Sequence, residues 1–235
     1  MSESPYARAA GLYDALYSFK DYAAEADRLH ALIQERRPGA RTLLDVACGT
    51  GKHLERLATR YAVEGVDLDP ELLAVARERL PDVPLHEADM LELDIGHRFD
   101  AVTCLFSSIG YVKTDTNLRR AVAAMARHLE PDGVLVVEPW IAPDAFTPGY
   151  LDLTYVDQPD LKVVRISVSA VIGALSVLHF NYLVGTADGV EHFTEDHELG
   201  LFTHEQYLGA FEAAGLRADY DADGLMGRGL YIGVS

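Results

Sequence analysis

Apolar positions along the chain change between a helical and an extended spacing, and the first clear stretch is helical. Residues 20–38, KDYAAEADRLHALIQERRP, place Ala26, Leu29, Leu32 and Ile33 on one face. Because Pro38 cannot continue a helix, the pattern predicts a helix over 20–38 that ends there.

Strand and helix signals then alternate through the middle of the chain. The extended apolar runs are TLLDVA (42–47), VEGVDL (63–68), VPLHEA (83–88), FDAVTCLF (99–106) and VLVVEPW (134–140). Helical patterns lie between them at 53–60, after the N-cap Asp69 with Pro70 behind it, and at 115–129 before a turn EPDG. Strands without strict alternation, separated by helices, predict a doubly wound α/β fold with a parallel sheet covered on both faces.

The alternation changes after residue 150. The segments LKVVRISVSA, LSVLHFNYLVG and GVEHFTEDHELGLF follow one another with short turns, which predicts an antiparallel meander within 151–202. Thr203 and Gln206 predict a capping box for a helix that ends at Gly215. LRADYDA and RGLYIGVS predict a final strand pair.

A glycine turn, LLDVACGTGKHLE (43–55), joins the first strand to a helix. It lacks the earlier glycine and the Ser or Thr after lysine that a Walker loop needs. It also lacks the third glycine of the dinucleotide fingerprint, and the nearby carboxylate of Asp45 would repel a pyrophosphate. The ammonium and sulfonium of S-adenosylmethionine favour such a carboxylate, and Gly49 and Gly51 allow a close backbone approach.

Two further acids follow the next two strands. Asp67 comes 22 residues after Asp45 (67 − 45), where a doubly wound fold places the carboxylate that binds ribose hydroxyls. Asp89 and Met90 follow the third strand, where they suit an adenine amine and ring. Each acid taken alone has a structural alternative, as a helix cap or the start of a turn.

At these residues, over Thr42 to Pro139, the sequence resembles the class I S-adenosylmethionine-dependent methyltransferases. The resemblance implies a seven-stranded Rossmann-like sheet whose last strand is antiparallel. Motif and resemblance together give the expected cofactor-binding residues: Tyr22, Asp45, Ala47, Gly49, Gly51, Asp67, Leu68, Asp89, Met90 and Leu105.

Further stretches narrow the resemblance. LYDALYSFKDYAAEA, CLFSSIGYVKT, VVEPWIAPDAFTPGY, VVRISVS and GLMGRGLYIGV are similar to the N,N-dimethyltransferases of nucleotide-linked (dTDP) amino-deoxysugars, of the desosamine and mycaminose type, in antibiotic biosynthesis. The resemblance implies N-methylation, or dimethylation, of the amine of a nucleotide-diphosphate amino sugar. It covers nearly the whole length and suggests a homodimer.

The expected domain organisation follows from pattern and resemblance together. We expect one domain, 1–235, with an N-terminal helical lid (1–38), a cofactor-binding core (39–150), an antiparallel β insertion over the active site (151–202) and a final helix and strands (203–235).

Methyl transfer to an amine is an in-line displacement that needs alignment and desolvation rather than a nucleophilic side chain. Tyr13, Tyr17 and Tyr22 are expected to form an aromatic lid, or alternatively a helix face packed on the sheet. Tyr111 follows the fourth strand; its hydroxyl, with a pKa near ~10, is a poor base but can orient an amine. Glu138 ends the fifth strand and points to the same crevice, or alternatively faces Trp140 and the insertion. Tyr13, Tyr111 and Glu138 are the expected catalytic residues.

A diphosphate requires local cations. Arg165 and Arg228 match arginines of the resembled family, and guanidinium groups suit bidentate phosphate contacts. The residues expected to bind the substrate are Phe106, Ser107, Ser108, Arg165 and Arg228.

Charge and composition limit other functions. A net charge of −17 argues against broad binding of nucleic acid or an anionic membrane. Cys48 and Cys104 lie in apolar runs, which favours free thiols and a soluble cytoplasmic protein. We expect no metal, because His192 and His197 differ by an odd number and cannot share one face of a strand.

Two alternatives remain open on the sequence. One keeps the methyl donor but has a small non-nucleotide acceptor for N- or O-methylation. The other is a cofactor-binding regulatory or scaffold protein without turnover.

Overall fold

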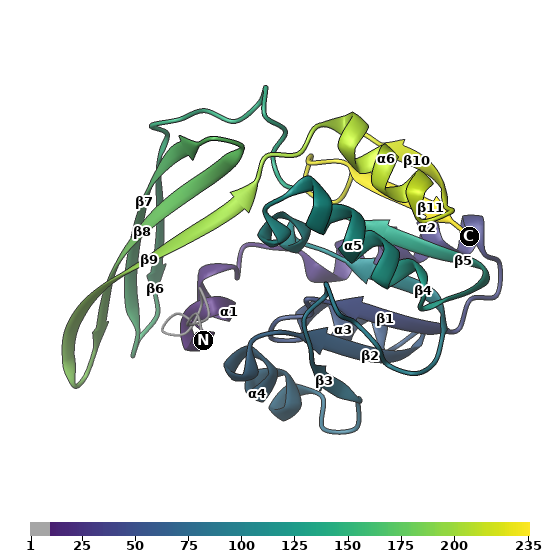
Figure 1. Ribbon diagram of the computed structural model, residues 1–235. Helices are drawn as coiled ribbons and strands as arrows, with labels where there is room; N and C mark the ends of the chain where they lie inside the picture. The colour runs from purple at the N-terminus through teal and green to yellow at the C-terminus, as the bar shows by residue number, and fades with distance from the viewer. Residues whose placement is uncertain (1–9) are drawn as a thin grey trace.

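A twisted sheet forms the centre of the computed structural model, which describes residues 10–235 (Figure 1). Within these residues the sheet has seven strands in the order β10-β11-β5-β4-β1-β2-β3. The strands are β1 (Thr42–Val46), β2 (Ala62–Asp67), β3 (Leu85–Glu87), β4 (Phe99–Cys104), β5 (Leu129–Val137), β10 (Arg217–Asp221) and β11 (Leu230–Val234). β1 to β5 run parallel, and β11 is antiparallel to both of its neighbours, which confirms the predicted fold class.

Helices cover both faces of this sheet. They are α2 (Tyr22–Arg36), α3 (Lys52–Leu57), α4 (Pro70–Arg79), α5 (Asp115–Ala126) and α6 (His204–Ala213), with short turns η1 (Ala10–Leu12), α1 (Tyr13–Leu16) and η2 (Ser108–Val112). Side-chain caps set their starts: Asp69 accepts from two backbone N–H groups of α4, and Thr203 and Gln206 form the predicted capping box of α6. The first long helix begins at Tyr22 rather than at residue 20, because Asp21 caps it by accepting from the Ala24 N–H.

The near-continuous apolar runs of the strands are explained by burial on two sides. Leu44 and Val46 of β1 pack in one core with α5 and α6, while Leu43 packs in a second core with α2, α3 and α4. Successive side chains of a strand point to opposite faces, so a strand between two helical layers must be apolar at every position.

A second, antiparallel sheet has the order β6-β7-β8-β9. Its strands are β6 (Leu151–Asp157), β7 (Lys162–Ile172), β8 (Leu175–Thr186) and β9 (Gly189–Gly200). Figure 1 shows it standing apart from the first sheet, with α1 between the two, and Leu16 of α1 is buried in the core of its inner face. The pattern had predicted three of these strands; β6 was missed.

Further predicted boundaries were wrong. The helix predicted over 53–60 ends at Leu57, and the helix predicted over 115–129 ends at Ala126. The stretch EPDG, predicted as a turn, lies inside β5, where Asp132 takes a left-handed φ of 59° and the register with β4 shifts. An irregular position of this kind lets a strand continue through residues that otherwise favour a turn.

Candidate active site

The turn after β1 opens the first half of the site. Gly49 and Gly51 have φ values of 57° and 77°, and Ala47 has 59° although it carries a Cβ. A left-handed alanine costs on the order of 1–3 kcal/mol and persists where the surroundings enforce it, as at ligand sites. The strained turn lies at the carboxyl ends of the parallel strands, where such sheets bind ligands.

Two buried carboxylates line this turn. Asp67 accepts the Gly49 N–H at 2.7 Å and the Asp69 N–H at 2.9 Å, so it holds the glycine turn in place. Asp45 accepts the Thr103 hydroxyl at 2.7 Å, and burial raises its pKa to about 6.

The third expected acid lies at the turn after β3. Asp89 accepts the Leu91 N–H at 2.9 Å, so it forms the turn considered as its structural alternative, and Met90 packs against the core beside it. Leu68 is 64% exposed immediately after Asp67 and forms an apolar surface at this end of the sheet, whereas Leu105 is buried.

This set of groups fits the predicted cofactor. Buried carboxylates favour a ligand with an ammonium and hydroxyl groups and disfavour a phosphate. A carboxylate oxygen has lone pairs for more than one donor, so the backbone bonds of Asp67 still allow it to accept a ribose hydroxyl.

The segment after β4 forms the border between the cofactor side of the site, described above, and a cavity on the acceptor side. Phe106 and Ser107 both have left-handed φ values, 51° and 62°. Glu138 Oε2 accepts the Phe106 N–H at 2.7 Å, and Ser107 donates to the Pro139 carbonyl at 2.7 Å. The other oxygen of Glu138, Oε1, is buried without a hydrogen-bond partner in the described part of the chain, and burial raises the pKa of this carboxyl.

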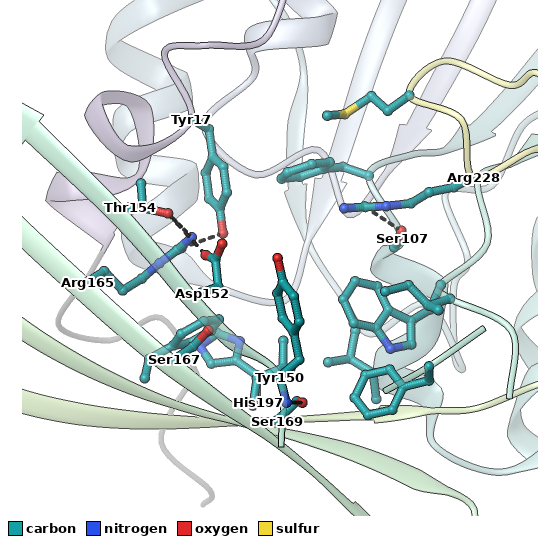
Figure 2. Close-up of a pocket in the computed structure, with 18 of the residues that line it drawn as sticks. Tyr17, Ser107, Tyr150, Asp152, Thr154, Arg165, Ser167, Ser169, His197 and Arg228 are labelled. Atoms are coloured by element: carbon teal, nitrogen blue, oxygen red, sulfur yellow. Dashed lines mark hydrogen bonds between the residues drawn. The ribbon is translucent and has the colours of Figure 1, made fainter. Parts of the chain in front are cut away.

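A cavity of about 750 Å³ lies beyond this border, between the core and the inner face of the second sheet (Figure 2). Four of the residues expected from the sequence to act on the acceptor side line it: Phe106, Ser107, Arg165 and Arg228; Tyr111, from the catalytic set, joins them. Trp140, Phe146 and Tyr150 add aromatic surface. Its size and mixed lining are typical of a site for a small molecule.

The insertion side of the cavity is organised by Arg165. Its guanidinium donates to the Tyr17 hydroxyl and to Thr154 Oγ1, both at 3.0 Å, and Asp152 lies beside it in Figure 2. Its Nε is buried with no hydrogen-bond partner among residues 10–235. Since the Tyr17 ring also stands edge-on to Phe106, Tyr17 connects the N-terminal segment to both the insertion and the core.

Arg228 faces the cavity from the opposite side in Figure 2. It donates to Ser107 Oγ at 3.0 Å and lies 5.3 Å from the Trp140 ring centre. One arginine on each side gives this acidic chain two cationic groups at one cavity.

Several of the expected residues, among them Tyr13, Tyr22, Ser108 and Glu138, do not line the cavity. The Tyr13 ring packs against Tyr17, 4.7 Å between centres, and Ser108 begins η2. Tyr22 stands edge-on to His53 at a smaller hollow formed around the start of α2.

The sequence reasoning missed Lys20 and gave His197 only as a metal candidate. Lys20 is buried, pairs with Glu25 at 2.9 Å and lies 4.1 Å above the Phe106 ring centre. His197 lines the cavity, and its Nδ1 lies 2.6 Å from the Tyr111 hydroxyl. The contacts of Lys20 with Phe106 and of His197 with Tyr111 join residues far apart in the sequence, so no local pattern predicts them.

Residues 10–235 contain neither a metal-binding cluster nor a membrane-spanning helix. No group of three or more His, Cys, Asp or Glu side chains is arranged to hold a metal ion there. Nor do these residues contain a helix whose length and apolar character would let it span a bilayer.

The strand order, the strained glycine turn and the buried acids at the strand ends define a class I S-adenosylmethionine-dependent methyltransferase. A family model described as a methyltransferase domain matches residues 43–133. The dTDP-3-amino-3,6-dideoxy-alpha-D-glucopyranose N,N-dimethyltransferase of Streptomyces fradiae is 46% identical over 96% of this chain and 90% of its own. The dTDP-3-amino-3,4,6-trideoxy-alpha-D-glucopyranose N,N-dimethyltransferase of Streptomyces venezuelae is 44% identical over 96% of this chain and 97% of its own. The chain belongs to the family of these N,N-dimethyltransferases.

Solved structures of methyltransferases have the same fold as this chain. DesVI of Streptomyces venezuelae superposes with a TM-score of 0.92 at 44% identity, covering 96% of this chain and 97% of that one. An amino pentose methyltransferase from Micromonospora echinaspora, solved with its methyl donor SAM bound, gives a TM-score of 0.87 at 42% identity, covering 100% and 98%. S-adenosylmethionine is therefore the cofactor of this enzyme.

Proposed function

We propose that this enzyme N-methylates, and in two turnovers dimethylates, the amino group of a dTDP-linked amino-deoxysugar in natural-product biosynthesis. The observation that carries the proposal is the pair of arginines, Arg165 and Arg228, on opposite sides of one cavity in a chain of net charge −17. A diphosphate needs such local cations, because the rest of the protein repels it. The similarity to the two Streptomyces dimethyltransferases supports the same acceptor.

The cofactor, when bound, supplies a methyl group on a sulfonium. On the cofactor side, Asp45 and Asp67 favour its ammonium and ribose, and the left-handed turn at Ala47 brings the backbone close. These cofactor contacts are predictions, and so are the other expected ones, through Tyr22, Gly49, Gly51, Leu68, Asp89, Met90 and Leu105.

On the acceptor side, Arg165 and Arg228 would hold the diphosphate and fix the sugar. Phe106 and Ser107 are held rigidly by Glu138 and Pro139, so the border facing the reacting amine is preorganised. The unpartnered Oε1 of Glu138 suits an N–H donor reaching into this border from either half of the site. Tyr13 and Ser108 remain proposed members of the site through the segments they begin.

The direct test is transfer from labelled methyl donor to a panel of dTDP-3-amino and dTDP-4-amino sugars. We expect mono- and then dimethylated product from at least one of them. Transfer to none would exclude this function and favour the small non-nucleotide acceptor.

We infer that the enzyme works as a homodimer in the cytoplasm. The outer face of the second sheet carries a continuous apolar patch: Leu151, Leu153, Tyr155, Val164, Ile166 and Val168. The three β6 members of this patch are 62–72% exposed, and a patch without charges can meet its own copy across a twofold axis. Light scattering should give twice the chain mass of 25.8 kDa, and Ile166→Asp should give a monomer. The two buried, unlinked cysteines support a reducing compartment.

A further inference from the structure

The inner face of the second sheet places an imidazole directly behind Tyr111. His197 of β9 is 2% exposed, and its Nδ1 lies 2.6 Å from the Tyr111 hydroxyl. The Phe180 ring packs edge-on against the imidazole, 4.8 Å between centres, which fixes its orientation. Both Tyr111 and His197 line the cavity.

A carboxylate stands on the other side of the same imidazole. Glu195 precedes His197 by two residues and therefore shares its face of β9; Glu195 Oε2 lies 3.7 Å from His197 Nε2. A carboxylate on this side favours the tautomer with hydrogen on Nε2. We therefore assign Nδ1 of His197 as the acceptor. The Tyr111 hydroxyl donates its hydrogen to Nδ1, and the lone pairs of its oxygen remain able to accept a hydrogen bond.

The neighbouring strand, β8, places apolar side chains opposite His197 and Glu195. β8 presents Leu178 opposite His197 and Phe180 opposite Glu195. Tyr111 from η2 and Glu195 from the same strand are titratable groups that contact the ring.

N-methylation of an amine creates a proton that must leave. A neutral amine attacks with its lone pair, and the product is an ammonium that cannot react again until an N–H bond breaks. A phenol with a pKa near ~10 is a poor acceptor for that proton on its own. A phenol that donates to an imidazole while it accepts from the ammonium does not need to ionise first.

We propose that Tyr111, His197 and Glu195 form a proton relay that deprotonates the acceptor amine, an inference that rests on the proposed function. The ammonium N–H bond breaks, its electron pair stays on nitrogen, and the proton bonds to the Tyr111 oxygen. The Tyr111 O–H bond breaks in the same step, and that proton bonds to His197 Nδ1. The resulting imidazolium faces Glu195 and releases its proton to water after the product leaves. His197 and Glu195 act through Tyr111 and are positioning residues.

The test compares Tyr111→Phe, His197→Gln, Glu195→Gln and the double variant of Tyr111 and His197. With a dTDP-amino sugar accepted by the wild type, kcat should fall about 100-fold in either of the first two variants. Monomethylated product should accumulate, and KM and the cofactor Kd should change less than twofold. Because the two groups act as one unit, the double variant should be no slower than the worse single variant.

The matched control is His179→Gln. His179 bonds to Asp196 at 2.7 Å on the same sheet, but that pair is exposed on the outer face. This variant should keep wild-type kcat and product ratio, and thermal melting should show all variants folded. His197→Gly with added imidazole provides a second route, since partial recovery of kcat is expected only for a proton-transfer role.

The outcomes separate the two proposals. Wild-type turnover with an unaffected kcat and product ratio in His197→Gln overturns the relay alone. Losses that multiply in the double variant overturn it as well. No wild-type transfer to any dTDP-amino sugar overturns the proposed function and the relay with it.

Discussion

Replacing Arg228 by alanine should weaken the binding of thymidine diphosphate, because the change removes one of the two cationic groups at the cavity. Arg228 donates one hydrogen bond to Ser107 in the structure, and a guanidinium has five N–H donors. Two of the others can reach a phosphate in parallel.

The expected loss follows from these bonds. A hydrogen bond to a charged group contributes about 1.5–3 kcal/mol. Arg228 is half-buried, so we take about half of the sum for two bonds, roughly 1.5–3 kcal/mol. At about 1.4 kcal/mol per tenfold change, Kd should rise about 10- to 150-fold. Arg228→Lys keeps the charge but loses the planar fork, so its Kd should lie between wild type and Arg228→Ala.

Isothermal titration with thymidine diphosphate measures the effect, and cofactor affinity measured beside it should not change. Arg28→Ala is the matched control, because Arg28 pairs with Asp221 at 2.5 Å on the surface, away from the cavity. An Arg228→Ala Kd within twofold of wild type would refute the reasoning. It would mean that no diphosphate reaches Arg228, which favours the non-nucleotide acceptor.

Three further changes test the cofactor side and the buried charges beneath it. Asp67→Asn replaces the carboxylate that accepts two backbone N–H groups, so cofactor Kd should rise at least tenfold in a calorimetric titration. Since burial raises the pKa of Asp45 to about 6, cofactor affinity should fall as pH drops from 8 to 5.5, and Asp45→Asn should show no such trend. Glu25→Ala leaves the buried Lys20 and His53 without their carboxylate, which costs about 3 kcal/mol and should lower Tm by about 6–12 °C. Burial raises the pKa of Glu25, but hydrogen bonds from His53 and Lys20 lower it by more. The stabilisation by this carboxylate is therefore complete above its unfolded pKa and is lost as pH falls through the lower folded value, which pH-dependent melting checks.

The parallel core could be predicted because each strand carries its own signal. Leu43 and Leu44 face opposite helical layers, so the strand is apolar at consecutive positions, and only a sheet covered on both faces requires this. β6 lacked such a signal: its outward residues, among them Leu153 and Tyr155, are apolar and exposed, while its inward residues include the polar Thr154, which accepts from Arg165. Its alternation is inverted relative to an ordinary half-buried strand, which hid it.

The site likewise has one part with a local sequence signal and one part without it. The cofactor side was predictable because Asp45, Gly49 and Gly51 are contiguous and their spacing carries the geometry. The cavity is assembled from contacts between distant segments: Arg165 meets Tyr17 across 148 residues, and Tyr111 meets His197 across 86. No local period records such pairs, so the arginines were found only through resemblance, and the partner of Tyr111 was not found.

The charges of the two halves explain how one acidic chain can serve two ligands of opposite charge. Buried carboxylates stand at the strand ends, and the two arginines stand across the border formed by Phe106 and Ser107. Interactions between exposed charges are screened beyond about 8 Å at physiological salt, so the net charge of −17 matters less at the cavity than its own arginines. Between the halves, an ammonium next to a cationic methyl donor is disfavoured by like charge, which lowers the pKa of the acceptor amine. Loss of the amine proton is therefore favoured at this border. In the proposed relay, the proton passes to the neutral hydroxyl of Tyr111, which is hydrogen-bonded to His197.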